Sequence, residues 1–353
     1  MAVSEATATR AMWLPRRSRR LRAGLSSLGA VLLSLLVGGM LMVIAGGEPI
    51  AAYGSLIEGS FGSPYAIGQL FLLVVPFTII GLGLALAFRG RVYNIGAEGQ
   101  LFMGALAGGV VAIFLPVALD PLLIVVSVVA GTAAGAAWGG IVGVLRARWG
   151  VSEVITSLLL NFVALYAFTY CVRQPLRAEG AATDLQGRAV QQDAVLPRLP
   201  ELNVHVGILI AVALVPLAWY AMARTPFGMR VRMLGLNAEA ARTAGVRSRR
   251  MIVGLMLISG GLAGLVGAIQ TLGVAEGLDL GISQGYGFTA IVVALLGRLH
   301  ALGVLFAAVF IAMLQSGGQA MSVTEGLPYA IVLAIPAVFV VFLLIADRLA
   351  REA

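Results

Sequence analysis

Long apolar stretches separated by small clusters of charge run along almost the whole chain. Cutting the sequence at every Asp, Glu and Arg leaves ten uncharged stretches of 18 or more residues. These are residues 23–47, 59–88, 99–119, 121–145, 154–172, 202–223, 251–275, 280–297, 299–324 and 326–346. A helix needs about 20 apolar residues to cross the roughly 30 Å hydrocarbon core of a bilayer. The pattern therefore predicts an all-α polytopic membrane protein with about ten transmembrane helices, among which the 280–297 span is short and rich in glycine.

The composition agrees with this class and excludes a soluble globular enzyme. Of the 353 residues, 60% are hydrophobic and 11% charged, against about 25% charged in ordinary soluble domains. All 24 basic residues are arginine, so the chain has no lysine for a nucleotide-binding P-loop or a Schiff base. One cysteine, Cys171, and two histidines, His205 and His300, are too few for a disulfide framework or a histidine-rich metal site. We expect no catalytic residues, no metal site and no cofactor bound by this chain.

The distribution of arginine predicts the orientation in the membrane. With the N-terminus inside, 20 of the 24 arginines fall on the cytoplasmic side, as the positive-inside rule requires. The other four lie beside four acidic residues in a long outside loop, 173–201. The prediction is N-in and C-in, with a cytoplasmic tail at 1–22, a transmembrane domain at 23–347 and a second tail at 348–353. Because the arginines are dispersed over six segments, the net charge of +8 indicates topology and no nucleic-acid partner.

The first span follows a basic leader of 22 residues. Both the leader and the apolar run 23–47 are longer than those of an ordinary secretory signal, whose apolar region has about 7–15 residues. We expect a retained helix, with a cleaved signal peptide as the alternative.

Glycines recur every four residues along the fourth span, at positions 131, 135, 139 and 143. Small residues at this spacing allow transmembrane helices to approach closely. We expect packing within the chain, with a dimer seam as the alternative.

Three segments carry polar or glycine-rich patterns that transmembrane packing alone does not require. The first, Arg89–Gln100, reads RGRVYNIGAEGQ and sets Asn94, Glu98 and Gln100 among glycines directly before the third span. An ionisable group at membrane depth indicates a functional site, and non-helical backbone there is tolerated where protein buries it or where it lines a cavity. An ordinary cytoplasmic turn is the alternative that the composition leaves open.

The second segment is the longest cytoplasmic loop, 224–250. Asn237 is suited to cap the start of a short alanine-rich helix, and Gly245 is suited to end it. A charged loop with such a helix is a natural contact for a soluble partner; a solvated connector is the alternative.

The third segment, 276–303, has four glycines leading into a short hydrophobic run that ends at Gly297. This pattern predicts a broken or re-entrant helix. A shortened transmembrane helix with a flexible entrance is the alternative.

Together these segments resemble the permease subunits of ATP-binding-cassette (ABC) importers, in the branch for nucleosides and simple sugars such as ribose. Phe88–Gln100, ending in NIGAEGQ, and Thr225–Val246 are similar to two segments of bacterial nucleoside-importer permeases. Tyr286–Gly303 is similar to a third, although Ala301 stands where the family usually has proline and Leu299 where it has a polar residue. With the segment that begins at Glu48, the resemblance to the longer permease of nucleoside systems extends over about 25–350.

The resemblance implies a translocation subunit in the cytoplasmic (inner) membrane that is moved by other proteins. Its expected partners are ABC ATPase subunits that carry ATP and Mg²⁺, a second permease subunit, an extracytoplasmic solute-binding protein and membrane lipid. Part of the 224–250 loop matches the E-A-A-x-x-x-G signature of importer permeases and is expected to form a cytoplasmic coupling helix. The residues expected to couple to the ATPase are Asn237, Glu239, Ala240, Ala241, Arg242 and Gly245.

The expected substrate path follows from side-chain chemistry. Amides and a carboxylate suit sugar hydroxyls or a nucleobase edge, and aromatic faces suit stacking on a base. The candidates are Asn94, Glu98, Gln100, Gln284, Tyr286 and Phe288. A structural role for Glu98 is the alternative to solute contact.

Other functions are weighed against this one. Within ABC importers, a ribose-type sugar or branched-chain amino-acid permease is the runner-up. In another class, an ion-coupled secondary transporter would need carboxylates or histidines within its spans, and these spans are nearly free of charge. An intramembrane enzyme is disfavoured because the sequence has neither a paired acidic motif nor H-E-x-x-H.

Overall fold

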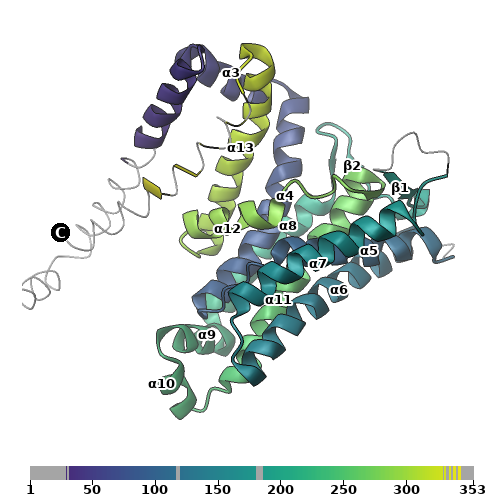
Figure 1. The fold of residues 1–353 in the computed structure, drawn as a ribbon, viewed down its shortest axis with the longest axis vertical. Coiled ribbons are helices and arrows are strands. Elements are labelled where there is room, and N and C mark those ends of the chain that lie inside the picture. The colour runs from purple at the N-terminus through teal and green to yellow at the C-terminus, as the bar shows by residue number, and fades with distance from the viewer. Residues whose placement is uncertain are drawn as a thin grey trace, which may run out of the picture. The chain divides into compact units, whose positions relative to one another are not determined.

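The computed structural model of the chain is built almost entirely of helices (Figure 1). It describes residue 29, residues 32–116, 120–179 and 186–328, and six isolated positions from 330 to 342. Both predicted tails, 1–22 and 348–353, and most of the expected last span, 326–346, lie outside the described residues.

Among the described residues, seven helices are long and apolar enough to cross a membrane, which confirms an all-α polytopic membrane protein. They are α4 (Pro64–Arg89), α5 (Ala97–Phe114), α6 (Asp120–Trp149), α7 (Glu153–Arg173), α8 (Gly207–Arg224), α11 (Ser248–Gln270) and α13 (Ala301–Glu325). A π-helical turn, η3 (Thr271–Ala275), extends α11. Pro76 and Pro216 lie inside α4 and α8.

Seven full-length spans are described against the ten predicted: most of the last one, 326–346, lies outside the described residues, and the structure differs from the prediction at two others. In the first predicted span, the helix Leu32–Ile44 turns by 113° into α3 (Pro49–Phe61), so the two together form at most one broken span. In the predicted 280–297 span, only α12 (Tyr286–Leu296) is helical, and its 11 residues rise about 16 Å, half of a bilayer core. The sequence prediction of 280–297 as a complete helical span is therefore wrong, and the broken or re-entrant helix stays a prediction beside its alternative, a shortened helix with a flexible entrance.

The chain divides into two compact units, and the division falls inside α13. The first unit contains residues up to Ser63 and those from Met313 onward. In it, α3 packs against the second half of α13 where Ser60 Oγ donates to the Met313 carbonyl, at 3.0 Å. A Cβ atom at Gly317 would lie 2.0 Å from the Leu56 carbonyl oxygen, so this helix pair requires glycine at that position.

The second unit, Pro64–Ala312, has α5, α6 and α11 at its centre, where they pack through glycine. A Cβ atom at Gly264 would lie 2.4 Å from the Gly131 carbonyl oxygen, and one at Gly135 would lie 2.5 Å from the Gly260 oxygen. Backbones this close gain dispersion contacts that lipid cannot replace. The prediction that the glycine stripe of the fourth span packs within the chain is thus confirmed.

One end of the second unit is covered by the connection between α7 and α8. It contains three short strands and the 3₁₀ turn η2 (Gln192–Ala194), and a fourth strand joins it from the segment between η3 and α12. The strand β1 (Gln186–Ala189) pairs antiparallel with β4 (Gly277–Asp279), and β2 (Arg198–Leu199) pairs with β3 (Val204–His205). The sequence predicted this segment only as a long loop.

The opposite end of the second unit gathers arginine. Arg146 at the end of α6 donates to the Arg91 carbonyl after α4, at 3.0 Å. Arg232 of α9 (Pro226–Leu236) donates to the Met222 carbonyl near the end of α8. We call this the arginine end, defined by Arg89, Arg91, Arg146, Arg232 and Arg247. It is the end that the positive-inside rule assigns to the cytoplasm.

Candidate functional site

The polar residues between α4 and α5 form a closed hydrogen-bond network. The amide nitrogen of Asn94 donates to Gln100 Oε1 at 2.8 Å and to Ser259 Oγ at 2.9 Å. Gln100 Nε2 returns a bond to Asn94 Oδ1 at 3.0 Å, and the backbone nitrogen of Gly96 donates to the same oxygen at 2.9 Å. Asn94 and Gln100 are fully buried. Their side chains therefore hold the turn before α5 against α11, because unpaired amides at this depth would be costly.

The same turn is fixed from its other side by α7. Gly99 N donates to Asn161 Oδ1 at 2.8 Å, and Asn161 Nδ2 donates to the Ile95 carbonyl at 2.9 Å. Ile95 N donates to Ser157 Oγ at 3.2 Å. Sequence reasoning missed Ser157, Asn161 and Ser259, although each is a polar residue within a predicted apolar span, and that is the signal that could have identified them.

Glu98 joins the starts of two helices. It lies in the first turn of α5 and is 7% exposed. Its Oε2 accepts from Gly287 N at 2.8 Å and its Oε1 accepts from Ser283 Oγ at 2.6 Å, both at the start of α12. Helix N-termini carry partial positive charge, so both helices stabilise this carboxylate. A Cβ atom at Gly287 would lie 2.3 Å from Glu98 N, which explains why glycine stands there.

The remaining three path candidates lie at the start of α12 and differ in exposure. Tyr286 is buried and packs edge-on against Phe77, with 5.7 Å between ring centroids. Gln284 and Phe288 are exposed on the second unit, Phe288 by 43%. The structure therefore brings all six path candidates to one region, with four of them in internal contacts and two with side chains open.

The short helix predicted in the 224–250 loop is present as α10 (Ala238–Thr243). Asn237 caps it, because its Oδ1 accepts from Glu239 N at 2.9 Å and from Ala240 N at 3.1 Å. Gly245 ends the segment with φ +82°, a conformation in which other residues are strained. Both ends are therefore formed by the residues that the sequence assigned to them.

Two of the three alanines of α10, Ala240 and Ala241, differ in exposure. Ala241 is 1% exposed and packs within the chain, whereas Ala240 is exposed. Glu239 and Arg242 form an ion pair with both side chains 72% exposed. The surface that α10 leaves open to a partner thus includes Glu239, Ala240 and Arg242, whereas Ala241 packs the helix against the rest of the chain.

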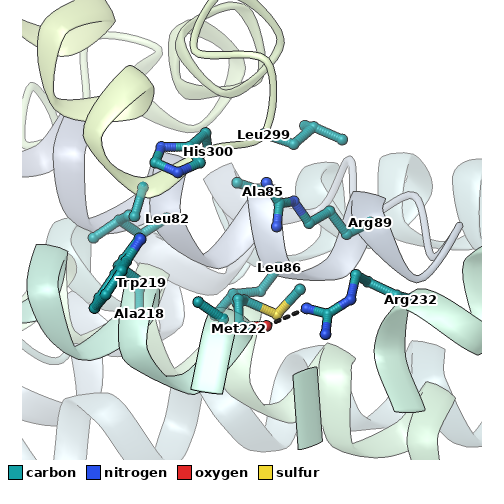
Figure 2. A pocket seen from close by; sticks show the side chains of 12 residues that line it. Leu82, Ala85, Leu86, Arg89, Ala218, Trp219, Met222, Arg232, Leu299 and His300 are labelled. Carbon is teal, nitrogen blue, oxygen red and sulfur yellow. Dashed lines mark hydrogen bonds between the residues drawn. The ribbon is translucent and has the colours of Figure 1, made fainter. Parts of the chain in front are cut away.

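A cavity of about 250 Å³ lies at the arginine end, between α4, α8, α9 and the turn that joins α12 to α13 (Figure 2). Arg89, Arg232 and His300 reach it from three different segments, with Trp219 on its α8 side. Sequence reasoning did not identify this pocket, because its parts are far apart in the chain and each arginine had been assigned to topology.

Within the part of the chain that the structure describes, no three His, Cys, Asp or Glu side chains come together to hold a metal ion. Glu153 at the start of α7 accepts from Tyr93 N at 3.2 Å and pairs with Arg146.

Comparison with known proteins gives a consistent result. The sequence profile of a family described as the permease component of branched-chain amino acid transport systems matches residues 66–346. The chain is 38% identical to the glucose ABC transporter permease protein TsgB13 of Haloferax volcanii over 91% of this chain and 87% of that protein. It is 33% identical to the guanosine ABC transporter permease protein NupP of Bacillus subtilis, over 92% and 94%. A nucleoside ABC transporter permease, NupB of Lactococcus lactis, is 29% identical over 92% of each chain.

Proposed function

The chain belongs to this family of ABC transporter permease components, and from that premise we propose that it forms the path by which nucleosides, or sugars of related chemistry, cross the cytoplasmic membrane. The observation that carries the proposal is the similarity, over more than nine tenths of both chains, to permeases named for guanosine and nucleosides. The spans and their apolar length supply the multi-pass membrane domain that such a path needs.

The carboxylate of Glu98 at the start of α12 favours an uncharged solute. In transporters with discontinuous helices, the positive N-terminal ends of half-helices often face an anionic group of the substrate. Here Glu98 already occupies the starts of α5 and α12, with bonds of 2.8 Å to Gly287 N and 2.6 Å to Ser283 Oγ. A nucleoside or sugar, without a carboxylate, fits this arrangement better than an amino acid does.

A sugar is the second candidate substrate, because a glucose permease is the relative with 38% identity. Nucleosides and sugars both present hydroxyl groups on a sugar ring, so the two candidates share much of their recognition chemistry. They differ in the base, which adds an aromatic face.

For the path itself, we infer that the exposed side chains at the start of α12 contact solute. Gln284 can exchange hydrogen bonds with a hydroxyl or a base edge, and Phe288 can stack on a base. The internal bonds of Asn94, Glu98 and Gln100 favour a positioning role: Glu98 fixes the start of α12, and Asn94 and Gln100 hold the turn before α5 against α11.

The energy for transport is proposed to come from separate ATPase subunits that bind ATP and Mg²⁺. This chain has no lysine with which to build a P-loop. The open face of α10 offers a small residue, Ala240, between two charged ones, Glu239 and Arg242, which suits close docking on a soluble partner. A second permease subunit and an extracytoplasmic binding protein complete the proposed complex.

The coupling proposal is tested by Ala240→Trp, which adds bulk on the open face of α10. We expect uptake to fall at least tenfold, with membrane level and thermal stability unchanged. Retained uptake by this variant would remove α10 from the proposal.

The substrate proposal is tested by uptake of labelled guanosine in cells that depend on this chain and its partner subunits. We expect unlabelled nucleosides to compete strongly, ribose and glucose weakly, and leucine not at all. Competition by glucose alone would favour the sugar candidate, and competition by leucine alone would contradict both.

A further inference from the structure

The cavity at the arginine end is built from one face of each of two helices. Leu82, Ala85, Leu86 and Arg89 recur at the i, i+3, i+4 and i+7 positions of α4, so they point to one side. Ala218, Trp219 and Met222 do the same on α8. All of its lining residues belong to the second unit.

All the ionisable side chains that line this cavity are basic. The side chains of Arg89, Arg232 and His300 line it, and no acidic residue does (Figure 2). Arg232 donates one of its N–H groups to the Met222 carbonyl, which fixes its guanidinium at the rim. Among the described residues, neither arginine forms an ion pair with a carboxylate. Two guanidinium groups that repel one another without a counter-charge create a site for an anion.

Its other walls are apolar. Leu82 is 2% exposed, Leu86 9% and Met222 6%, and they form the floor between α4 and α8. Trp219 is 39% exposed at the side, and tryptophan is enriched where the hydrocarbon meets the headgroups. A small hydrated anion would leave these walls unused, whereas an amphiphile with an acidic head and an acyl tail would contact both parts.

The position of the cavity agrees with that chemistry. It lies at the end of the bundle where the arginines gather and where α4 and α8 leave the predicted membrane. Basic pockets between helices at this level are a recurrent means of holding anionic lipid headgroups.

We propose that this cavity binds the phosphate of an anionic amphiphile, with a membrane phospholipid as its source. Arg89 and Arg232 bind the phosphodiester oxygens, since guanidinium groups match phosphate in a bidentate geometry. His300 contributes an additional donor from the α12–α13 turn, and the first carbons of an acyl chain lie along Leu82, Leu86 and Met222. The bound lipid would then hold α9, which leads directly into α10, against α4 and α8.

The test is native mass spectrometry of the full chain purified from nanodiscs of phosphatidylcholine with or without phosphatidylglycerol. We expect the wild type to retain phosphatidylglycerol at least tenfold more than phosphatidylcholine. Arg89→Gln and Arg232→Gln should each reduce that retention about tenfold or more. Arg224→Gln is the matched control, because Arg224 is an exposed arginine at the end of α8 that does not line the cavity.

Two further measurements distinguish a lipid phosphate from free phosphate and check that the variant is folded. Inorganic phosphate at millimolar concentration should not displace the lipid; displacement would identify a free-phosphate site and overturn the lipid proposal. Arg232→Gln removes the bond to the Met222 carbonyl and, on this proposal, the bound lipid, so a cooperative thermal unfolding transition, rather than an unchanged melting temperature, shows that the variant is folded. Equal retention of phosphatidylglycerol by the wild type and Arg232→Gln, or no preference over phosphatidylcholine in the wild type, would also overturn it.

Discussion

At the scale of single residues, the chain places polar groups at membrane depth and pairs them internally. Asn94 bonds to both Gln100 and Ser259, and Glu98 bonds to the start of α12. A polar group without a partner in the bilayer interior costs several kcal/mol, so such groups are either paired or functional. Here the pairing itself explains why they are present.

Replacing Asn94 with Ala should therefore act on stability before it acts on transport. The substitution leaves Gln100, Ser259 and the Gly96 N–H without their buried partner, and we expect a loss of about 2–4 kcal/mol. The measurement is thermal unfolding in detergent, with Gln284→Ala, an exposed amide, as the control that should unfold like the wild type. If Asn94→Ala unfolds normally and only uptake is lost, Asn94 contacts solute and the structural interpretation is wrong.

His205 gives the protein a pH-dependent stability on the side opposite the arginine end. It is fully buried in β3, and its Nδ1 accepts from Gly207 N at 3.2 Å, so the ring is neutral. Burial, together with the charge of Arg198, lowers the pKa of His205 from 6.5 to about 4. As pH falls below 6.5 the unfolded chain takes up this proton first, so stability declines from there to pH 4 and is unaffected above.

The expected decline in the free energy of unfolding is about 3 kcal/mol between pH 6.5 and pH 4. It is measured as the melting temperature of the wild type and of His205→Gln at pH 7.5 and pH 4.5. The wild type should lose more stability on acidification than the variant. Parallel losses in the two proteins would show that His205 has no part in the pH dependence.

At the scale of elements, close packing of helices through glycine decides which substitutions the bundle accepts. On α11, a Cβ atom at Gly264 would lie 2.4 Å from the Gly131 carbonyl oxygen, whereas one at Gly254 would meet no heavy atom within 4 Å. Replacing glycine with alanine at these two positions of α11 should therefore change the stability of the protein in opposite directions.

We expect Gly264→Ala to destabilise the protein by about 1–3 kcal/mol because α6 must move away. Gly254→Ala should be neutral or stabilising by about 0.5–1 kcal/mol, as expected for glycine replaced in an open helix position. Melting temperatures of the two variants in detergent decide the matter. Equal values would mean that α6 and α11 are not in contact at Gly131.

Most elements were predictable from the sequence because charge interrupts the apolar pattern at their ends. The long spans, the cap of α10 at Asn237 and its end at Gly245 follow from local rules. Local rules do not predict hydrogen bonds between residues far apart in the sequence. Asn94 and Ser259 are 165 positions apart, and Glu98 and Gly287 are 189 apart. The inward face of Ala241 was equally unpredictable, since a six-residue helix has no long periodic pattern.

At the scale of the whole molecule, the orientation in the membrane remains a prediction from the distribution of arginine along the sequence. Contacts gather Arg89, Arg146 and Arg232 at one end of the second unit, and the short strands cover the other. A labelling experiment with single cysteines in a Cys171→Ser background can assign the two sides. Both test positions, Ala240 in α10 and Gln186 in β1, are exposed.

We expect Ala240→Cys to react with a membrane-impermeant maleimide only after the cells are opened. Gln186→Cys should react in intact cells. The reverse labelling pattern would invert the predicted topology and would remove α10 from the reach of a cytoplasmic ATPase.

The most direct test of the central claim, that this chain is the translocation subunit of an ATP-driven importer, is the energy source of guanosine uptake. Uptake is measured in cells in which a protonophore abolishes the proton gradient while ATP is maintained, and in cells in which arsenate depletes ATP while the membrane potential is kept. The predicted result is that uptake persists with the protonophore and stops with arsenate. Uptake that stops with the protonophore and persists without ATP would contradict the claim and identify an ion-coupled transporter.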